Sequence, residues 1–220
     1  MPHEQYRLAD IPVDDAWVRK NNETLSEVRR LQWSAGILGL IVLGAGIAML
    51  IYSEMAAWGW MIAVVAGVFA IGSLAMIWYI PRKMGSLHHT YATSELVPAV
   101  VAEVRPRGVT LLALVDQAVD RSVGRRPALA ARNTGMIPGH EAKVGERVPC
   151  VAVAGNRAAR GSDNLYHFVT PMPVAWATSD KAEIRRLAKE IPSGEWDTLR
   201  KHLDRVTEVA ARPTSLLPLD

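Results

Sequence analysis

The sequence predicts an α+β membrane protein, in which a transmembrane helical hairpin carries a small cytoplasmic β-barrel and two C-terminal helices. Three observations lead to this fold class. Two apolar runs of membrane-spanning length lie within residues 33–80, and Glu54 is the one charged residue in that stretch. Short runs with a period of two follow over residues 96–178, as is typical of β-strands. Two segments with helical spacing of their apolar residues complete the chain.

Residues 1–32 are expected to form a cytoplasmic N-terminal segment with one amphipathic helix. Residues 1–13 are polar, and no basic region followed by a short apolar run marks a cleavable signal peptide. Asp14 and Asp15 can cap a helix over about 16–32. This helix either lies against the membrane surface or a partner, or is a polar helix that leads into the first span.

Residues 33–80 predict a hairpin of two transmembrane helices. A span needs roughly 20 apolar residues to cross a hydrocarbon core of roughly 30 Å, and residues 34–52 and 58–80 both satisfy this. Arg29 and Arg30 precede the first span, Arg82 and Lys83 follow the second, and the connection has no basic residue. The positive-inside rule therefore places both termini in the cytoplasm, with two spans in the plasma membrane.

Small residues recur at a spacing of four within the two predicted spans, a pattern that allows helix backbones to approach closely in lipid. They fit either contact between the two helices or docking on another subunit. No ionisable residue lies inside either span, which argues against a transporter or a channel. The candidate helix-packing positions are Ala35, Gly39, Gly44, Ala63 and Gly67.

A juxtamembrane linker over residues 81–95 precedes the predicted β-barrel at 96–178. Five strands are expected: a hairpin of 98–104 and 109–119, then 127–133, 147–155 and 165–178. Their number and turns fit an OB-like or an SH3-like barrel, and the pattern does not separate these two. His88 and His89 in the linker have no third ligand nearby in the sequence, so no metal site is predicted.

Residues 179–213 predict a helical tail, and residues 214–220 a loosely held C-terminus. Ser179 or Asp180 can cap a helix over 181–191, and Ser193 can cap a longer one over about 194–211. The longer helix carries one apolar stripe, which either packs on the barrel or meets a partner helix.

No sequence motif for catalysis, nucleotide binding or a metal is found, so neither an enzyme activity nor a cofactor is predicted. Cys150 with His167 would be a nucleophile and its base, but this cysteine lies in an apolar strand without a visible activator. His140, His167 and Asp163 remain candidates for an enzyme site that arises only in three dimensions. Nucleic-acid binding is not predicted, because stacking aromatic residues along a basic groove are missing.

Two predicted loops of the barrel carry arginines. If both loops face the bilayer, they can contact anionic lipid headgroups, together with the basic pair that follows the second span. Ordinary solvated loops are the alternative. The candidate headgroup-binding residues are Arg82, Lys83, Arg125, Arg126, Arg157 and Arg160.

The C-terminal half contains KVGERVPCVAVAG, YHFVTPMPVAWATSD and an IPSGEW turn into a helix. With these motifs the chain resembles, over roughly residues 14–210, uncharacterised two-span membrane proteins of mycolic-acid-containing actinobacteria. Similar small proteins of that group are accessory subunits of the cytochrome bcc–aa3 respiratory supercomplex. The resemblance therefore implies an accessory role, and it assigns no site residues.

The features favour a non-enzymatic accessory or scaffold subunit of a plasma-membrane complex, in contact with other membrane-protein subunits. They are the charge-free hairpin, the missing catalytic motifs and the amphipathic faces at 16–32 and 194–211. The alternative function is a membrane-anchored binding or sensing module. In that case the cytoplasmic barrel recognises a lipid headgroup, a peptide or a nucleotide.

Overall fold

The computed structural model of the chain describes residues 7–9, 11–83, 87–120, 122, 124–155 and 164–219. The chain divides into two compact units. Residues 1–22 and 87–220 form a globular unit, and residues 23–86 form a helical hairpin. The globular unit is therefore built from both sides of the hairpin in the sequence.

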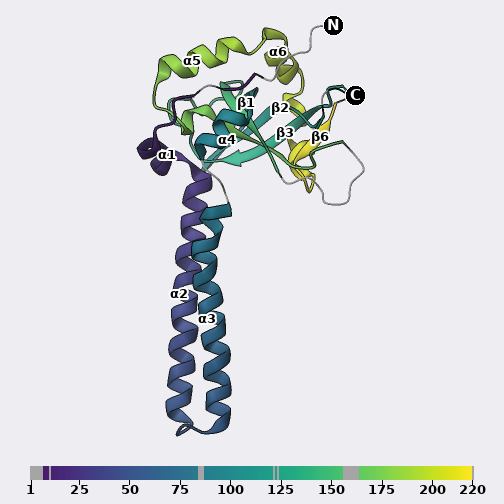
Figure 1. Ribbon diagram of the computed structural model, residues 1–220. Coiled ribbons are helices and arrows are strands. Elements are labelled where there is room, and N and C mark those ends of the chain that lie inside the picture. Colours follow the sequence, from purple (N-terminus) through teal and green to yellow (C-terminus); the bar gives the residue numbers. More distant parts are fainter. Residues whose placement is uncertain are drawn as a thin grey trace. The chain divides into compact units, whose positions relative to one another are not determined.

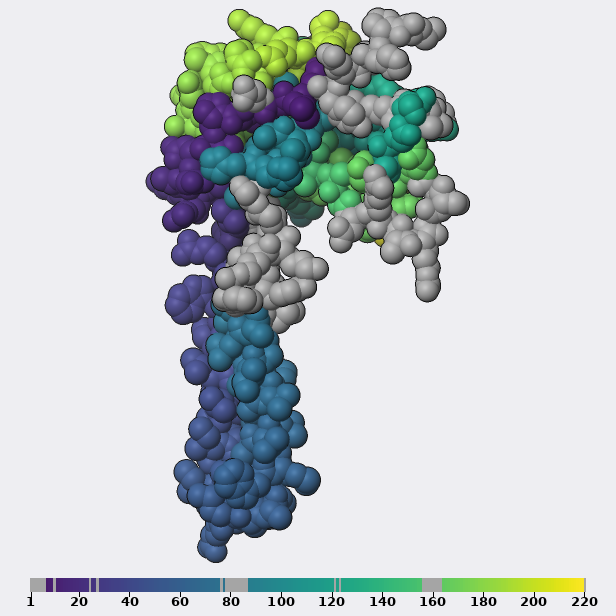
Figure 2. Space-filling model, in the orientation of Figure 1, coloured from purple at the N-terminus to yellow at the C-terminus, as the bar shows by residue number. Residues whose placement is uncertain are grey.

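The hairpin consists of α2 (Glu23–Tyr52) and α3 (Ala57–Lys83), which run antiparallel beside each other (Figure 1). Within the described residues these are the two helices long and apolar enough to cross a membrane. Glu54 and Met55 adopt positive φ values of 51° and 63° in the connection, which reverses the chain in four residues. Most side chains of the hairpin are exposed and stand out along its length (Figure 2). The predicted pair of apolar helices with a short connection is confirmed.

The globular unit is built on a curled sheet of six antiparallel strands in the order β5-β4-β1-β2-β3-β6. The sheet is a half-barrel. The sheet curls so that β5, at one edge, lies over β3. The guanidinium of Arg132 in β3 donates to the carbonyl oxygen of Pro171 in β5 at 3.3 Å. The strands are β1 (Glu95–Arg105), β2 (Gly108–Asp116), β3 (Pro127–Thr134), β4 (Arg147–Ala154), β5 (Val169–Pro173) and β6 (Leu216–Pro218).

The first four predicted strands agree with β1 to β4 to within a few residues. The fifth is shorter than expected, because a 3-10 turn, η2 (Val174–Trp176), replaces its second half. The sixth strand was not expected. Leu216 and Leu217 pair with β3 and are buried, so the C-terminal segment that was expected to be loosely held forms one edge of the sheet.

Helices cover the sheet (Figure 1). Asp180 caps α5 (Lys181–Glu190), as predicted. The expected single helix over 194–211 is divided into α6 (Ser193–Lys201), η3 (Leu203–Arg205) and α7 (Val206–Ala211), and Ser193 makes no capping hydrogen bond. The predicted apolar stripe is mostly buried in the globular unit: Trp196, Leu199 and Val206 are buried and Leu203 is partly buried, but Ala210 is exposed and Val209 is buried in its place.

The expected helix over 16–32 is interrupted. Asp14 caps α1 (Asp15–Asn21) through its carboxylate, as predicted, but the chain becomes extended at Asn22 and α2 begins at the next residue. Asn22 is buried, and its side-chain amide contacts the sulfur of Met172 at 3.9 Å. Part of the expected linker is also helical, as α4 (Leu87–Thr93). In Figure 2 the purple segment that contains α1 lies beside α4, where His88 and Asp15 form an ion pair of 2.8 Å.

Candidate functional site

One end of the sheet combines loops, buried charge and cavities, and we call it the loop end. Strand β1 begins there, next to the end of β4, because Glu95 is paired with Ala152. Strand β2 ends there and β3 begins, with Asp116 opposite Pro127. The loop end is therefore made of the start of β1 and the described parts of two loops, the β2–β3 loop (117–120, 122 and 124–126) and the β4–β5 loop (155 and 164–168).

The two loops are joined by hydrogen bonds. The backbone amide of Tyr166 donates to the carbonyl oxygen of Gln117 at 2.7 Å, and that of Val119 donates to the carbonyl oxygen of Asn164 at 3.0 Å. The Asn164 side chain accepts from the amide of Asp120 and donates to its carbonyl oxygen. A neutral side-chain amide can both accept and donate hydrogen bonds, and Asn164 does both. The two loops are therefore held together as one continuous surface.

A charge cluster lies beneath these loops. The carboxylates of Glu95 and Asp116 are buried, with side-chain exposures of 8% and 4%, and Arg125 reaches both. Its guanidinium nitrogens lie 3.5 Å from an oxygen of Glu95 and 3.6 Å from Oδ2 of Asp116. The other oxygen of Asp116 accepts the backbone amides of Ala118 and Arg126, each at 2.9 Å. Burying two carboxylates is costly without such partners, so the cluster fixes the β2–β3 loop in place.

Three cavities meet around this cluster. The largest, of about 560 Å³, lies between the two loops and the end of β6, and Arg125 and Arg126 line it. A second, of about 290 Å³, lies between α4 and the end of β4 and is lined by Glu95 and Asp116. The third, of about 180 Å³, lies beside an ion pair in which one guanidinium nitrogen of Arg7 donates to both carboxylate oxygens of Glu195, and Arg125 lines it as well. The largest of the three has a volume in the range of small-ligand pockets.

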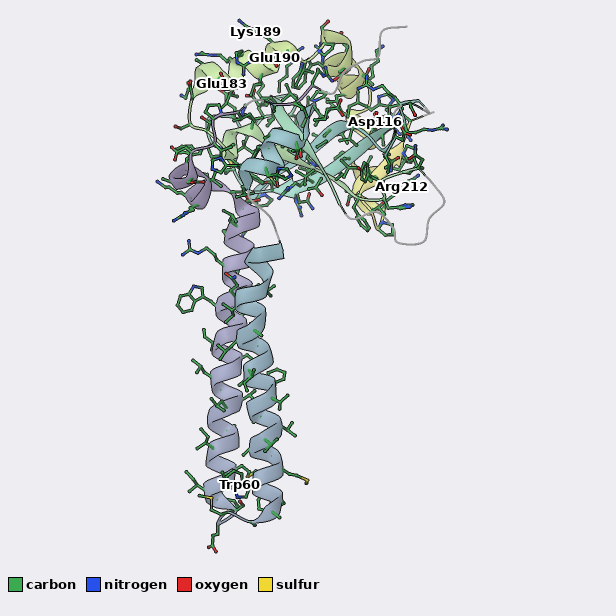
Figure 3. The ribbon with its side chains drawn as sticks, in the orientation of Figure 1. Trp60, Asp116, Glu183, Lys189, Glu190 and Arg212 are labelled. Carbon is green, nitrogen blue, oxygen red and sulfur yellow. The ribbon has the colours of Figure 1, made fainter. Side chains whose placement is uncertain are left out.

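Other carboxylates lie elsewhere. Glu183 and Glu190 lie on α5, well apart from Asp116 in Figure 3. There both carboxylates bind the guanidinium of Arg186 on the surface of the helix. Bonding to Arg186 lowers the pKa of Glu183, which is typical of an exposed ion pair on a helix. The loop end therefore differs from these sites, because its carboxylates are buried.

The sequence-predicted headgroup residues are only partly described. Arg125 and Arg126 both lie at the loop end. Arg82 and Lys83 form the last turn of α3, and their side chains are outside the described part of the chain. Arg157 and Arg160 are outside it altogether. The structure thus brings two of the six together with a cavity.

The helix-packing candidates separate into two groups. A side chain at Gly39 would lie 3.3 Å from Cβ of Ser73, and one at Gly46 would lie 3.5 Å from Cα of Ala63, so Gly39 and Ala63 are at the helix contact. Nothing lies within 4 Å of an added Cβ at Gly44 or Gly67, so these two glycines face away from the other helix. Ala35 is partly buried.

The enzyme candidates do not form one site within the described residues. Burial raises the pKa of the Cys150 thiol, which is enclosed in β4, so it is held in its unreactive protonated form. The imidazole of His140 contacts the carboxylate of Glu146, and the backbone carbonyl of Glu146 accepts from the amide of Val101. Val101 lies well along β1 from its start at the loop end, where His167 lies. Asp163 lies outside the described residues. Among the described residues no group of three metal-ligating side chains is found.

Sequence reasoning missed Glu95 and Asp116. Each is one acidic residue next to an apolar strand, a pattern typical of strand ends in general. Only the pairing of β1 with β2 and the return of the β2–β3 loop bring both carboxylates to Arg125. Their positions could have indicated this, because in an antiparallel hairpin the start of the first strand lies beside the end of the second, and Glu95 and Asp116 stand at these two places.

Comparisons with known proteins place this unit in a family. Residues 82–207 match the family described as "Protein of unknown function (DUF3239)", which is more than half of the chain. The chain belongs to this family. The match includes β1 to β5 and α4 to α6, and so it includes the loop end.

A solved structure is also similar to the chain. It is the crystal structure of "a putative membrane protein from Corynebacterium diphtheriae", with 44% sequence identity and a TM-score of 0.54. The similarity covers 57% of this chain and 100% of that chain. A comparison with curated proteins finds no match. The expected resemblance to membrane proteins is thus supported, and the role in a respiratory supercomplex stays a prediction.

Proposed function

We propose that this protein is a membrane-anchored binding module without catalytic activity. In this proposal the α2–α3 hairpin spans the plasma membrane, and the half-barrel recognises a ligand or partner at its loop end on the cytoplasmic side. One observation carries the proposal: three cavities meet around the buried cluster of Glu95, Asp116 and Arg125. Buried charge that is costly to fold is often retained for function.

The anchor is supported by the composition of the hairpin. Both helices are of membrane-spanning length, and their apolar side chains are mostly exposed in the unit itself, as expected for a surface that lipid covers. Trp60 lies near the closed end of the hairpin, at the position of an interfacial aromatic residue (Figure 3). The basic residues that flank the two helices support a cytoplasmic half-barrel.

Hydrogen exchange tests the binding module. The full-length protein is compared in native membrane vesicles and after purification in a mild detergent, with peptide-level mass spectrometry. A ligand at the loop end slows exchange in segments 117–126 and 164–168 in the native vesicles, whereas the β1–β2 turn at residues 105–108 exchanges alike in both samples. Equal exchange at the loop end in both samples would count against a binding module.

The second candidate is the accessory or scaffold subunit of a plasma-membrane complex, a respiratory supercomplex being one such complex. The observations that support this candidate differ from those expected from the sequence. The face at 194–211 is not left over for partners, because Trp196 and Leu199 are buried inside the globular unit, whereas Leu31 of the face at 16–32 is 59% exposed. What favours this candidate now is the hairpin, where Gly44 and Gly67 leave the outer helix faces flat enough for close packing.

Blue-native electrophoresis after mild extraction tests this candidate. The wild-type protein then migrates with other subunits, and the double variant Gly44→Leu with Gly67→Leu migrates alone. A matched control, Ile47→Leu with Ile71→Leu, changes exposed residues of the same helices without adding bulk and keeps the association. Migration of the wild-type protein as a lone monomer would exclude the accessory role.

A further inference from the structure

We infer that the 560 Å³ cavity at the loop end is a binding site for a phosphate ester with an apolar portion. This inference rests on the proposed binding module and names its ligand chemistry. The cavity combines two adjacent arginines at its rim with an apolar wall, and it is set between loops that are already fixed by hydrogen bonds.

Arg126 provides an available positive charge. Its side chain is exposed and lines the cavity, and among the described residues no carboxylate lies within ion-pair distance of it. Its backbone is fixed, because its amide donates to Asp116 and its carbonyl oxygen accepts from the amide of Gln117 at 2.9 Å. A planar guanidinium on a fixed backbone suits an oxygen anion that can accept two parallel hydrogen bonds.

Arg125 brings a second guanidinium to the same rim. Its position is set by Glu95 and Asp116, which line the two smaller cavities and do not line this one. A ligand in the large cavity therefore meets the arginines first, with the carboxylates behind them. Asp120 is the acidic residue of the same loop; its carboxylate accepts the amide of Ser122 at 2.9 Å and does not line the cavity.

Most of the other residues that line the cavity are apolar. Ala118 and Leu165 come from the two loops, and Pro127, Pro218 and Leu219 come from the start of β3 and the end of β6. The amides of Gln117 and Asn164 are already engaged in joining the loops, so they add little to ligand binding. A charged group at the rim and an organic body against these apolar residues are what a phosphate ester offers, and a bare inorganic ion would leave these residues unused.

Two sources supply such a ligand: the headgroup of an anionic phospholipid, and a soluble phosphate ester such as a nucleotide or sugar phosphate. The experiment separates them with full-length protein in a non-ionic detergent. In the lipid arm, native mass spectrometry compares the retention of phosphatidylglycerol and phosphatidylcholine. In the soluble arm, calorimetry measures binding of glycerol 3-phosphate and adenosine monophosphate.

The decisive variant is Arg126→Glu, with Arg126→Lys as the conservative variant and Arg107→Glu as the matched control. Arg107 is an exposed arginine in the β1–β2 turn, at the other end of the sheet. We expect the charge reversal to weaken binding by about tenfold or more, because it removes a charge-assisted hydrogen bond. The control should leave binding unchanged. The lysine variant keeps the charge and so keeps most of the binding. Circular dichroism confirms that each variant is folded.

Preference for phosphatidylglycerol that depends on Arg126 assigns the site to lipid, and binding in the soluble arm alone assigns it to a small phosphate ester. Equal retention of both lipids with no binding in the soluble arm overturns the inference, as does wild-type affinity in Arg126→Glu. If the loop end is protected from exchange in native membranes while no phosphate ester binds, the binding module stands and only this ligand is excluded.

Discussion

Arg132 of β3 shows how one residue holds the half-barrel in its curl. Its guanidinium donates to the carbonyl oxygen of Pro171 in β5, a strand that is not its neighbour in the sheet. It also lies 4.8 Å from the ring centroid of the buried Trp176. A cation over an indole face and a charge-assisted hydrogen bond thus connect β3 with the β5 region, two parts of the sheet that no backbone ladder joins.

Replacing this arginine should open the curl. We expect Arg132→Met to lower the free energy of unfolding by about 1–3 kcal/mol, since it removes a hydrogen bond and a cation–π contact but keeps apolar bulk. Thermal unfolding of the full-length protein, followed by tryptophan fluorescence, measures the change. Arg107→Met, at an exposed turn, is the control and should have little effect. Equal midpoints for both variants would contradict the role of Arg132.

Cys150 is the second residue with a measurable consequence. Burial raises the pKa of its thiol in the folded protein above the ordinary value of about 8.5. The thiol is protonated in both states below that pH, so its contribution to stability is complete there. As the pH rises above the ordinary value, the unfolded thiol ionises while the folded one does not, and stability falls.

The change should reach about 1.4 kcal/mol for each pH unit above the ordinary thiol pKa. Unfolding free energies at pH 7.5 and 9.5 are compared for the wild-type protein and Cys150→Ala. We expect the wild type to lose more stability than the variant over this interval. Burial likewise raises the pKa of Tyr91, which is present in both proteins and cancels in the comparison. Parallel loss in the two proteins would show that the thiol is not buried.

At the scale of elements, the local sequence pattern predicted those strands and helix starts that depend on neighbouring residues alone. Alternation predicted β1 to β4, and Asp14 and Asp180 correctly marked two helix starts. Two features depended on distant contacts and were missed. Helix α1 ends at Asn22 because that residue is buried in the globular unit, and β6 exists because β3 offers it an edge. A strand of three residues has no periodicity to detect.

The strand β6 gives a prediction at this scale. Leu217 is 3% exposed and pairs with Leu129 of β3. We expect Leu217→Ala to lower the free energy of unfolding by about 2–5 kcal/mol, the usual cost of truncating a buried leucine. Pro218→Ala, at an exposed position of the same strand, should change it by less than about 0.5 kcal/mol. Similar small effects in denaturant titrations of both variants would mean that the C-terminal segment is loosely held after all.

The candidate site could be predicted in part for the same reason. Adjacent arginines in a predicted loop were visible, and Arg125 and Arg126 do lie at a cavity. Their carboxylate partners were not visible, because Glu95 and Arg125 are separated by 30 positions and meet only through the register of β1 and β2. The sequence shows which residues are basic, whereas strand pairing in the folded sheet decides which of them line a cavity.

For the whole molecule, the proposed orientation of the hairpin can be tested directly. If both termini are cytoplasmic, the connection around Glu54 faces outward. We expect Glu54→Cys to react with a membrane-impermeant maleimide in intact cells, and Arg107→Cys to react only after the membrane is permeabilised. Both variants are made in a Cys150→Ala background. Labelling of the Arg107→Cys protein in intact cells would reverse the proposed orientation.

The residues before and after the hairpin share one hydrophobic core, and this restricts how the chain can evolve. Arg7 binds Glu195 with two bonds of 2.7 Å, and Leu8 bridges to Glu95, although the whole hairpin lies between these partners in the sequence. Segments that share one core must end up on one side of any membrane, so the crossings between them are even in number. Losing or gaining a single helix would break the core, whereas exchanging the pair would not. If the hairpin spans the membrane as proposed, the number of spans can change only in steps of two.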